Sequence, residues 1–365
     1  IVSINDMYGQ MLKGRFPINE NEADTMDVVN KLTTGTIALW RTMQQKMLPT
    51  PAKFHYIFNL RELSRVFQGI MLTPAETVKN GGFLCGKEGG NKMEFPGGGV
   101  TLLRIWKHEC ERVFSDKLTN LKDKATYKGW MEAQILETFG EEMSEMSQSS
   151  FYMVNFLRPD VLDEDGGMVE EAPKSYEPGG DLEAIRPVVM EFLDRFNYDN
   201  PSKKMELVLF NDALEHLLRI NRLMEMPRGS GLLVGVGGSG KQSLVRLSSY
   251  ISRSKNFQIT LTKSYNKVTF LENMKELYTW AGHQQKKVTF LFTESEIKDE
   301  VFLEFINSVL LTGEIPGLFA KDEIMAITAD LRNTFIKERA GVEDTQDNLK
   351  QFFIDKVRDN LHLMI

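Results

Sequence analysis

A glycine-rich segment that ends in a lysine carries the clearest chemistry in the sequence. Residues 235–241 read Gly-Val-Gly-Gly-Ser-Gly-Lys, which is the spacing of a phosphate-binding loop. Glycines let backbone N–H groups curl around phosphate oxygens, and Lys241 would reach the β- and γ-phosphates of a nucleotide. We expect the contacts to come from Gly235, Val236, Gly237, Gly238, Ser239, Gly240, Lys241, Gln242 and Ser243.

The positions that would hold a magnesium ion depart from the usual pattern. A Ser or Thr normally follows the lysine, because its hydroxyl binds Mg²⁺, but here Gln242 follows and Ser243 lies about 100° further around a helix. The apolar run 288–292 then ends at Thr293 and Glu294, where a metal-linked Asp and a water-activating Glu are usual. We therefore expect binding with impaired hydrolysis, with Mg²⁺ held through Glu294 or water. An ordinary exposed carboxylate is the alternative interpretation of Glu294.

The elements around this loop alternate between strand and helix from about residue 205. Apolar or alternating runs predict strands at 232–234, 257–261 and 288–292, and residues at helical spacing follow each of them. The glycine pattern alone would occur by chance in roughly one chain in ten. Its place between a strand and a helix favours the phosphate-binding interpretation over a turn that binds nothing. Such alternation builds an α/β fold, with a parallel sheet flanked by helices.

The N-terminal part is predicted to be all-helical. Apolar residues recur at helical spacing over 28–43 and 60–70, with prolines between the two runs. Residues 79–99 carry eight glycines and follow no strand, so we interpret them as a surface loop, which a helix over about 102–114 follows. We interpret residues 1–155 as one small helical domain.

An acidic stretch separates the two parts of the chain. Residues 160–183 hold nine acidic residues and one lysine, and we interpret them as an exposed connector. The acidic residues lack the order of a calcium-binding loop. The predicted organisation is therefore a helical domain to residue 155, an acidic connector with entry helices over 156–204, and an α/β domain over 205–365.

Composition narrows the classes of partner and compartment. The chain has 365 residues and a net charge of −7, which argues against broad binding of nucleic acid or anionic lipid. We therefore expect neither nucleic acid nor a membrane as a partner. Its two cysteines, Cys85 and Cys110, form neither a disulfide framework nor a zinc motif, which fits a reducing compartment. The chain starts without Met and ends in a predicted strand, so we expect a piece of a longer protein.

Several segments, in this order, resemble a dynein heavy chain. Residues 231–244, 257–261 and 313–319 are similar to its AAA+ motor ring, in the large part of the fourth module. Residues 55–65 resemble the helix entry of the third module's small helical domain. The glutamine after the lysine resembles axonemal forms more than cytoplasmic ones. The resemblance covers most of the chain, and the glycine-rich stretch 79–99 departs from it.

The resemblance implies a regulatory, nucleotide-binding segment of a microtubule motor that drives ciliary or flagellar sliding by ATP hydrolysis. ATP or ADP, with Mg²⁺ optional, would be the ligand. Arg61 would take the place of a sensor II arginine, although its helical context alone favours a solvated flank. Val208 and Leu209 would run past the adenine, with core packing an equal alternative. The fourth module's sensors and arginine finger would lie beyond residue 365, so the segment alone would be a poor ATPase.

The expected partners also follow from the resemblance. They are the other AAA+ modules of the same heavy chain and, through parts outside this segment, dynein light and intermediate chains and microtubules. The expected location is the cytoplasm and cytoskeleton, in the axoneme of a cilium or flagellum. Two alternatives remain open. One is an independent P-loop ATPase or kinase, which Gln242 and Thr293 disfavour, and the other is a structural ring segment with an empty loop.

Overall fold

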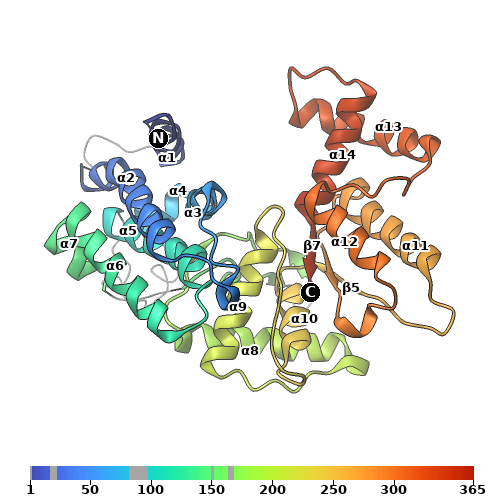
Figure 1. Cartoon of the computed structure of the whole chain (residues 1–365), viewed down its shortest axis with the longest axis horizontal. Helices are drawn as coiled ribbons and strands as arrows, with labels where there is room; N and C mark the ends of the chain where they lie inside the picture. Colours follow the sequence, from blue (N-terminus) through green and yellow to red (C-terminus); the bar gives the residue numbers. More distant parts are fainter. Residues whose placement is uncertain (1, 17–22, 82–97, 149–151, 163–167) are drawn as a thin grey trace. The chain divides into compact units, whose positions relative to one another are not determined.

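The computed structural model describes residues 2–16, 23–81, 98–148, 152–162 and 168–365. The chain divides into two compact units, Ile1–Val188 and Val189–Ile365. Figure 1 shows the elements of both units. Among the described residues, no helix combines the length and the apolar character that crossing a membrane requires.

The first unit is helical as far as α7, as the sequence predicts for this part of the chain, and α2 and α5 form its centre. The two helices pack against each other, and α2 also packs against α6. Trp106 of α5 is fully buried, and its indole N–H donates to the hydroxyl of Thr36 in α2 at 2.7 Å. A capping box starts α3, because the Glu62 carboxylate accepts the N–H of Asn59 at 3.0 Å. The helices are α1 (Val2–Arg15), α2 (Ala23–Lys46), α3 (Leu60–Leu72), α4 (Ala75–Asn80), α5 (Gly98–Cys110), α6 (Leu121–Phe139) and α7 (Glu141–Met146).

The glycine-rich segment falls largely outside the described residues, which omit 82–97. The helix predicted after it is confirmed as α5 and runs on into the π-helical turn η3 (Glu111–Ser115). Cys110 ends α5 fully buried, and burial raises the pKa of its thiol well above the ordinary range. It is thus a small buried residue and not a reactive thiol.

Two short antiparallel ladders cross the acidic stretch. The strand β1 (Met153–Val154) pairs with β4 (Glu177–Pro178), and β2 (Val161–Leu162) pairs with β3 (Met168–Glu170). Residues 163–167, in which three of the acidic residues lie, are outside the described part of the chain. The helix α8 (Leu182–Asp199) follows, and the boundary between the two units falls inside it.

The expectation of an exposed connector is wrong for the end of this stretch. Glu177 is fully buried, and its two carboxylate oxygens accept from the Arg158 guanidinium at 2.9 and 3.0 Å. Tyr176 is also buried and donates its hydroxyl to the Glu109 carboxylate of α5 at 2.5 Å. A bidentate ion pair with arginine compensates a carboxylate for the loss of its contacts with water. The acidic composition does not reveal this pairing, and it therefore misled the prediction.

The second unit contains a parallel sheet, which confirms the predicted α/β fold. Its strand order is β5 (Lys255–Gln258), β6 (Val288–Leu291) and β7 (Leu361–Met364). In Figure 1, α11 and α12 lie on one side of this sheet and α9 and α10 on the other. The helices are α9 (Asn211–Glu225), α10 (Lys241–Ile251), α11 (Lys267–Tyr278), α12 (Val301–Leu311), α13 (Lys321–Glu338) and α14 (Gln346–Asn360).

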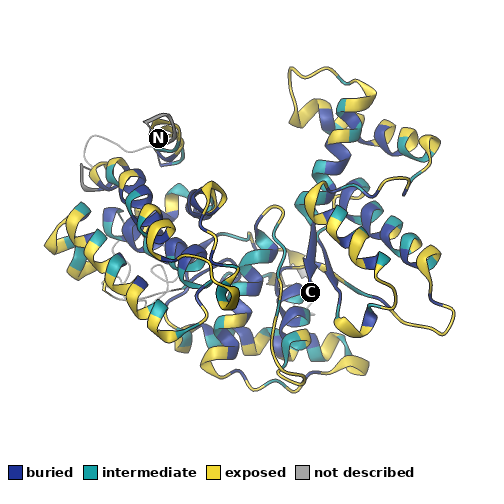
Figure 2. Ribbon diagram, viewed as in Figure 1, coloured by how far each residue is buried: buried dark blue, intermediate teal, exposed yellow. Residues whose placement is uncertain are grey.

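The central strand β6 is buried along its whole length (Figure 2). A strand with a parallel neighbour on each side and helices over both faces has no solvent-facing side chains, so it reads as a continuous apolar run. Phe290 of β6 and Phe292 beside it join a core in which the Phe270 and Phe302 rings stack at 4.4 Å. The strand predicted at 288–292 is therefore confirmed.

The strand predicted at 232–234 forms only a short hydrogen-bonded edge. Gly231 donates its N–H to Leu363 at 2.8 Å and Leu233 donates to Ile365 at 2.7 Å, which aligns this segment in parallel with β7. Yet Leu232 is 74% exposed and Val234 is 85% exposed. The segment pairs with β7 on one side, and no described element covers the face that these two side chains share. The predicted strand is therefore confirmed as a paired segment, and its apolar side chains Leu232 and Val234 remain exposed.

Candidate functional site

The glycine-rich loop is an exposed turn between the edge segment 231–234 and α10. Gly238 and Gly240 have φ angles of +76° and +79°, a left-handed backbone that glycine adopts without strain. The helix α10 begins at Lys241, with Gly240 as its N-cap and with no acidic residue in its first turn. Its first N–H groups receive no side-chain cap from the described residues, so they are available to an anion.

Lys241 is folded back over the loop that it follows. Its ammonium donates to the carbonyl oxygens of Gly235 and Val236, both at 2.7 Å, and lies 3.2 Å from the Ser239 hydroxyl. These acceptors are uncharged, and an ammonium is attracted more strongly to an anionic phosphate oxygen than to a carbonyl oxygen, because both partners then carry a full charge. A phosphate at the loop would therefore compete well for Lys241. Gln242 is exposed and Ser243 half-buried in the same turn of α10.

The metal-side positions follow β6 directly. Thr293 caps a short 3₁₀ turn, η6 (Glu294–Glu296), and its hydroxyl lies 2.9 Å from the Ser295 hydroxyl. Glu294 is exposed at the start of this turn. The order of the two residues is therefore as expected, but the Thr293 hydroxyl is engaged locally.

A second acidic residue in this turn was missed by the sequence analysis. Glu296 is 4% exposed, and its carboxylate accepts the N–H of Thr293 and the side-chain amide of Gln258, each at 2.8 Å. Burial raises the pKa of the Glu296 carboxyl, while these hydrogen bonds and the positive charge of Arg246 oppose the rise. The available signal was the spacing of Thr293 and Glu296, which is that of a capping box.

Comparison with known proteins agrees with the arrangement of strand, glycine loop and helix. Residues 205–365 match the family model described as the P-loop containing dynein motor region D4, and residues 32–85 match an AAA+ lid domain. The chain is 42% identical along its whole length to the dynein gamma chain of the flagellar outer arm of Chlamydomonas reinhardtii. It is 40% identical to dynein axonemal heavy chain 5 of Rattus norvegicus and, over 93% of its length, to dynein axonemal heavy chain 8 of Homo sapiens.

The chain belongs to the dynein heavy chain family. It spans 8% of the length of the Chlamydomonas protein and 10% of the rat protein. The resemblance inferred from residues 231–244, 257–261 and 313–319 is confirmed. The names of these relatives are flagellar and axonemal, in agreement with the expected location in an axoneme.

The residues expected beside the adenine of a dynein nucleotide site differ in exposure. Val208 is 82% exposed, whereas Leu209 is 6% exposed. Both residues precede α9. The burial of Leu209 fits the core-packing alternative, whereas the exposure of Val208 leaves its side chain available to a ligand. In the first unit, Arg61 lies exposed in the first turn of α3, where its backbone N–H donates to the Asn59 side chain at 2.9 Å. This exposure is compatible with a sensor role and with a solvated flank.

Magnesium would have few protein ligands in this dynein segment. No group of three or more His, Cys, Asp or Glu side chains among the described residues could hold a metal ion. Glu294 offers an exposed carboxylate, whereas the Thr293 hydroxyl already lies against Ser295. Mg²⁺ commonly takes one or two protein ligands and completes its shell with phosphates and water. The residues present fit that mode and do not fit an all-protein cage.

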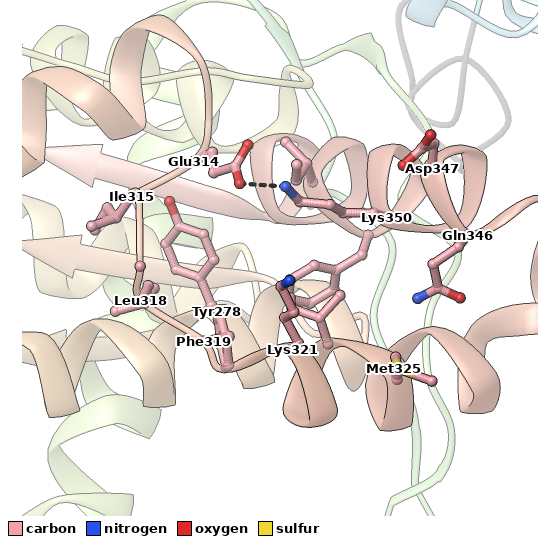
Figure 3. Close-up of a pocket in the computed structure, with 14 residues that line it drawn as sticks. Tyr278, Glu314, Ile315, Leu318, Phe319, Lys321, Met325, Gln346, Asp347 and Lys350 are labelled. Carbon is pink, nitrogen blue, oxygen red and sulfur yellow. Dashed lines mark ion pairs between the residues drawn. The ribbon is translucent and has the colours of Figure 1, made fainter.

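A separate cavity of about 440 Å³ lies between the loop after α12 and the starts of α13 and α14 (Figure 3). Its wall is mostly aromatic and aliphatic, and an ion pair of 2.6 Å joins Glu314 and Lys350 at its rim. The Tyr278 hydroxyl donates to the carbonyl of Gly313 at 2.9 Å, and burial raises the pKa of this tyrosine. The cavity shares no lining residue with the glycine loop or with the turn after β6.

Proposed function

We propose that this chain is a nucleotide-binding, regulatory segment of a dynein motor. ATP or ADP would bind at residues 235–243, with its phosphates against the loop and the first turn of α10. Val208 would contact the base. The site would hold nucleotide with weak or no hydrolysis.

One observation supports this proposal above the others. The Lys241 ammonium lies 2.7 Å from the carbonyl oxygens of Gly235 and Val236, directly over the turn that the left-handed Gly238 and Gly240 create. The lysine, the uncapped N–H groups of α10 and the helix dipole all favour an anion at this one place. A glycine turn that served only to connect two elements would not need a lysine there.

The weak hydrolysis follows from the groups on the metal side. Gln242 replaces the hydroxyl that usually holds Mg²⁺, and Thr293 replaces the carboxylate behind it. Glu294 remains available to orient water or to contact the metal through water. Phosphoryl transfer depends on charge stabilisation by a well-placed metal. The site would therefore still bind nucleotide but hydrolyse it slowly or not at all.

The whole heavy chain would use ATP hydrolysis elsewhere in its ring to drive microtubule-based movement in a cilium or flagellum. This segment would contact the neighbouring AAA+ modules of the same chain. Light and intermediate chains and microtubules would bind parts of the protein outside it. Arg61 would act as a sensor II residue for the preceding module.

Calorimetric titration of the purified chain with ADP tests the proposal. Replacing Lys241 by Ala removes a charge-assisted contact worth roughly 1.5–3 kcal/mol, so we expect the dissociation constant to rise at least about tenfold. Lys337→Ala removes an exposed lysine of α13 and serves as the matched control, with unchanged affinity expected. Equal affinities of Lys241→Ala and the unmodified chain would refute the assignment of the loop.

A further inference from the structure

Glu296 is a buried carboxylate with no role in the proposed binding of phosphate. It ends the turn η6, only 4% exposed, and both of its oxygens are used. One oxygen accepts the N–H of Thr293 at 2.8 Å, and the other accepts the amide of Gln258 at 2.8 Å. A carboxylate held from two elements in this way fixes the turn that carries Thr293 and Glu294 to the end of β5.

The Gln258 amide has its orientation set from both sides. Its oxygen accepts from the Arg246 guanidinium at 2.8 Å while its nitrogen donates to Glu296. A guanidinium can only donate and an ionised carboxylate can only accept, so the opposite orientation of the amide would break both contacts. Arg246 lies on α10, five residues after Lys241. A directed chain of hydrogen bonds therefore runs from the loop helix through β5 to the turn after β6.

Lys298 ties the residues just after this turn to the loop after β5. Its ammonium donates to three backbone carbonyls, those of Thr262, Lys263 and Tyr265, at 3.3, 3.1 and 3.0 Å. The turn is thus attached to β5 by Glu296 and to the following loop by Lys298. A displacement of α10 relative to β5 would have to be shared by the turn or would break the Arg246 contact.

We propose that Arg246, Gln258 and Glu296 form a positioning relay that transmits nucleotide binding from α10 to the turn carrying Thr293 and Glu294. The inference rests on the proposed function, because nucleotide is what would hold the start of α10. Glu296 is a positioning residue in this relay, since it touches Thr293 and not the ligand. Bound nucleotide would restrict the motion of α10, and through the relay it would also make local opening of the turn less frequent.

Hydrogen exchange of the purified chain, with and without ADP, tests the relay. The amide to follow is that of Thr293, within a peptide spanning residues 291–299, because its acceptor is Glu296. We expect saturating ADP to slow this exchange by about fivefold, the scale of one net hydrogen bond. In Gln258→Leu and Glu296→Gln, ADP should bind within about twofold of the unmodified chain but no longer slow the exchange.

The controls separate the relay from a loss of folding and from failure of the binding site. Glu300→Gln changes an exposed acid that directly follows this peptide and should keep the full response. Arg246→Gln changes the half-buried far end of the relay, leaves the packed turn intact and should also lose the response. Variants that bind ADP and keep the full slowing would overturn the relay, as would an unmodified chain that binds ADP with no change at Thr293. Unaltered ADP binding in Lys241→Ala would instead overturn the binding site itself.

Discussion

The glycine loop and the turn after β6 satisfy their polar groups in opposite ways. In the loop, residues 235–239 are exposed and the Lys241 ammonium is held only by neutral oxygens. In the turn, Glu296 is buried and both of its oxygens accept hydrogen bonds from fixed donors. The loop is therefore open to an exchange of partners, whereas the turn is closed.

This difference indicates that the loop is suited to binding a ligand and the turn to holding side chains in position. The contacts of Lys241 to uncharged oxygens cost little to replace by a phosphate, because the ammonium is attracted more strongly to an anion than to a carbonyl or hydroxyl oxygen. Breaking the Glu296 contacts would leave a buried carboxylate unsatisfied, which costs far more. Ligand binding should consequently change the loop and leave the turn's internal geometry intact.

The largest expected effect concerns the two metal-side positions that lack their usual ligands, Gln242 of α10 and Thr293 of the turn. In a full heavy chain with the other phosphate loops disabled, Gln242→Thr combined with Thr293→Asp should raise single-turnover ATP hydrolysis at this site. A gain of about 10²–10³ is the scale for one preorganised electrostatic group, and the two changes need not add because they act on one metal. Nucleotide affinity should change little, since Lys241 and the loop stay the same.

The unmodified site provides the decisive reference for that experiment. If it already hydrolyses ATP at the normal rate of the motor, the interpretation of Gln242 and Thr293 is wrong. Each single substitution should fall between the unmodified site and the double variant. Glu294→Gln in the double variant should abolish the gain, because a water-orienting carboxylate is then absent.

A smaller effect distinguishes two neighbouring glycines of the loop. Gly238 has a left-handed φ of +76°, whereas a side chain added at Gly237 would meet no atom within 4 Å. Gly238→Ala should lower the free energy of unfolding by about 1 kcal/mol, because alanine is strained in that backbone region. Gly237→Ala should change it by less than about 0.5 kcal/mol, in either direction. Urea unfolding measures both, and equal losses would mean that backbone strain does not explain the glycine at 238.

Local pattern and spacing predicted much of this protein, and long-range pairing did not. The loop, the helix from Lys241 and the strand 288–292 follow from spacing and periodicity alone. Glu296 was missed because its partner Gln258 lies 38 residues away in the sequence. Glu177 was misjudged for a similar reason, since Arg158, which neutralises it, lies 19 residues upstream. Burial of a charge depends on a partner, and composition does not reveal which partner folds beside it.

The edge segment 231–234 shows that an apolar run can predict pairing without predicting burial. Its apolar residues predicted a strand, and hydrogen bonding to β7 does not require that both faces be covered. Leu232 and Val234 are consequently exposed while their backbone is paired. Hydrophobicity predicted the element, and only the arrangement of its neighbours determines its burial.

The smallest predicted effect tests β7, which pairs with the turn's strand on one side and the loop's edge segment on the other. His362 of β7 is 1% exposed, and its Nδ1–H donates to the carbonyl of Gly229 at 2.8 Å. Burial lowers the pKa of His362 below its ordinary 6.5, more than the Gly229 contact raises it. Because the folded pKa is below the unfolded one, this histidine stabilises the fold above pH 6.5 and that contribution is lost as the pH falls.

Urea unfolding at pH 7.5 and pH 5.5 should therefore show a larger acid loss for the unmodified chain than for His362→Gln, which cannot gain a proton. His216→Gln, at an exposed histidine of α9, should keep the full loss. An identical loss in His362→Gln would remove His362 as the cause. The location of the amides that lose protection at acid pH also tests the contrast between loop and turn. Gly229 belongs to the edge side, so amides of residues 229–233 should lose exchange protection when His362 gains its proton.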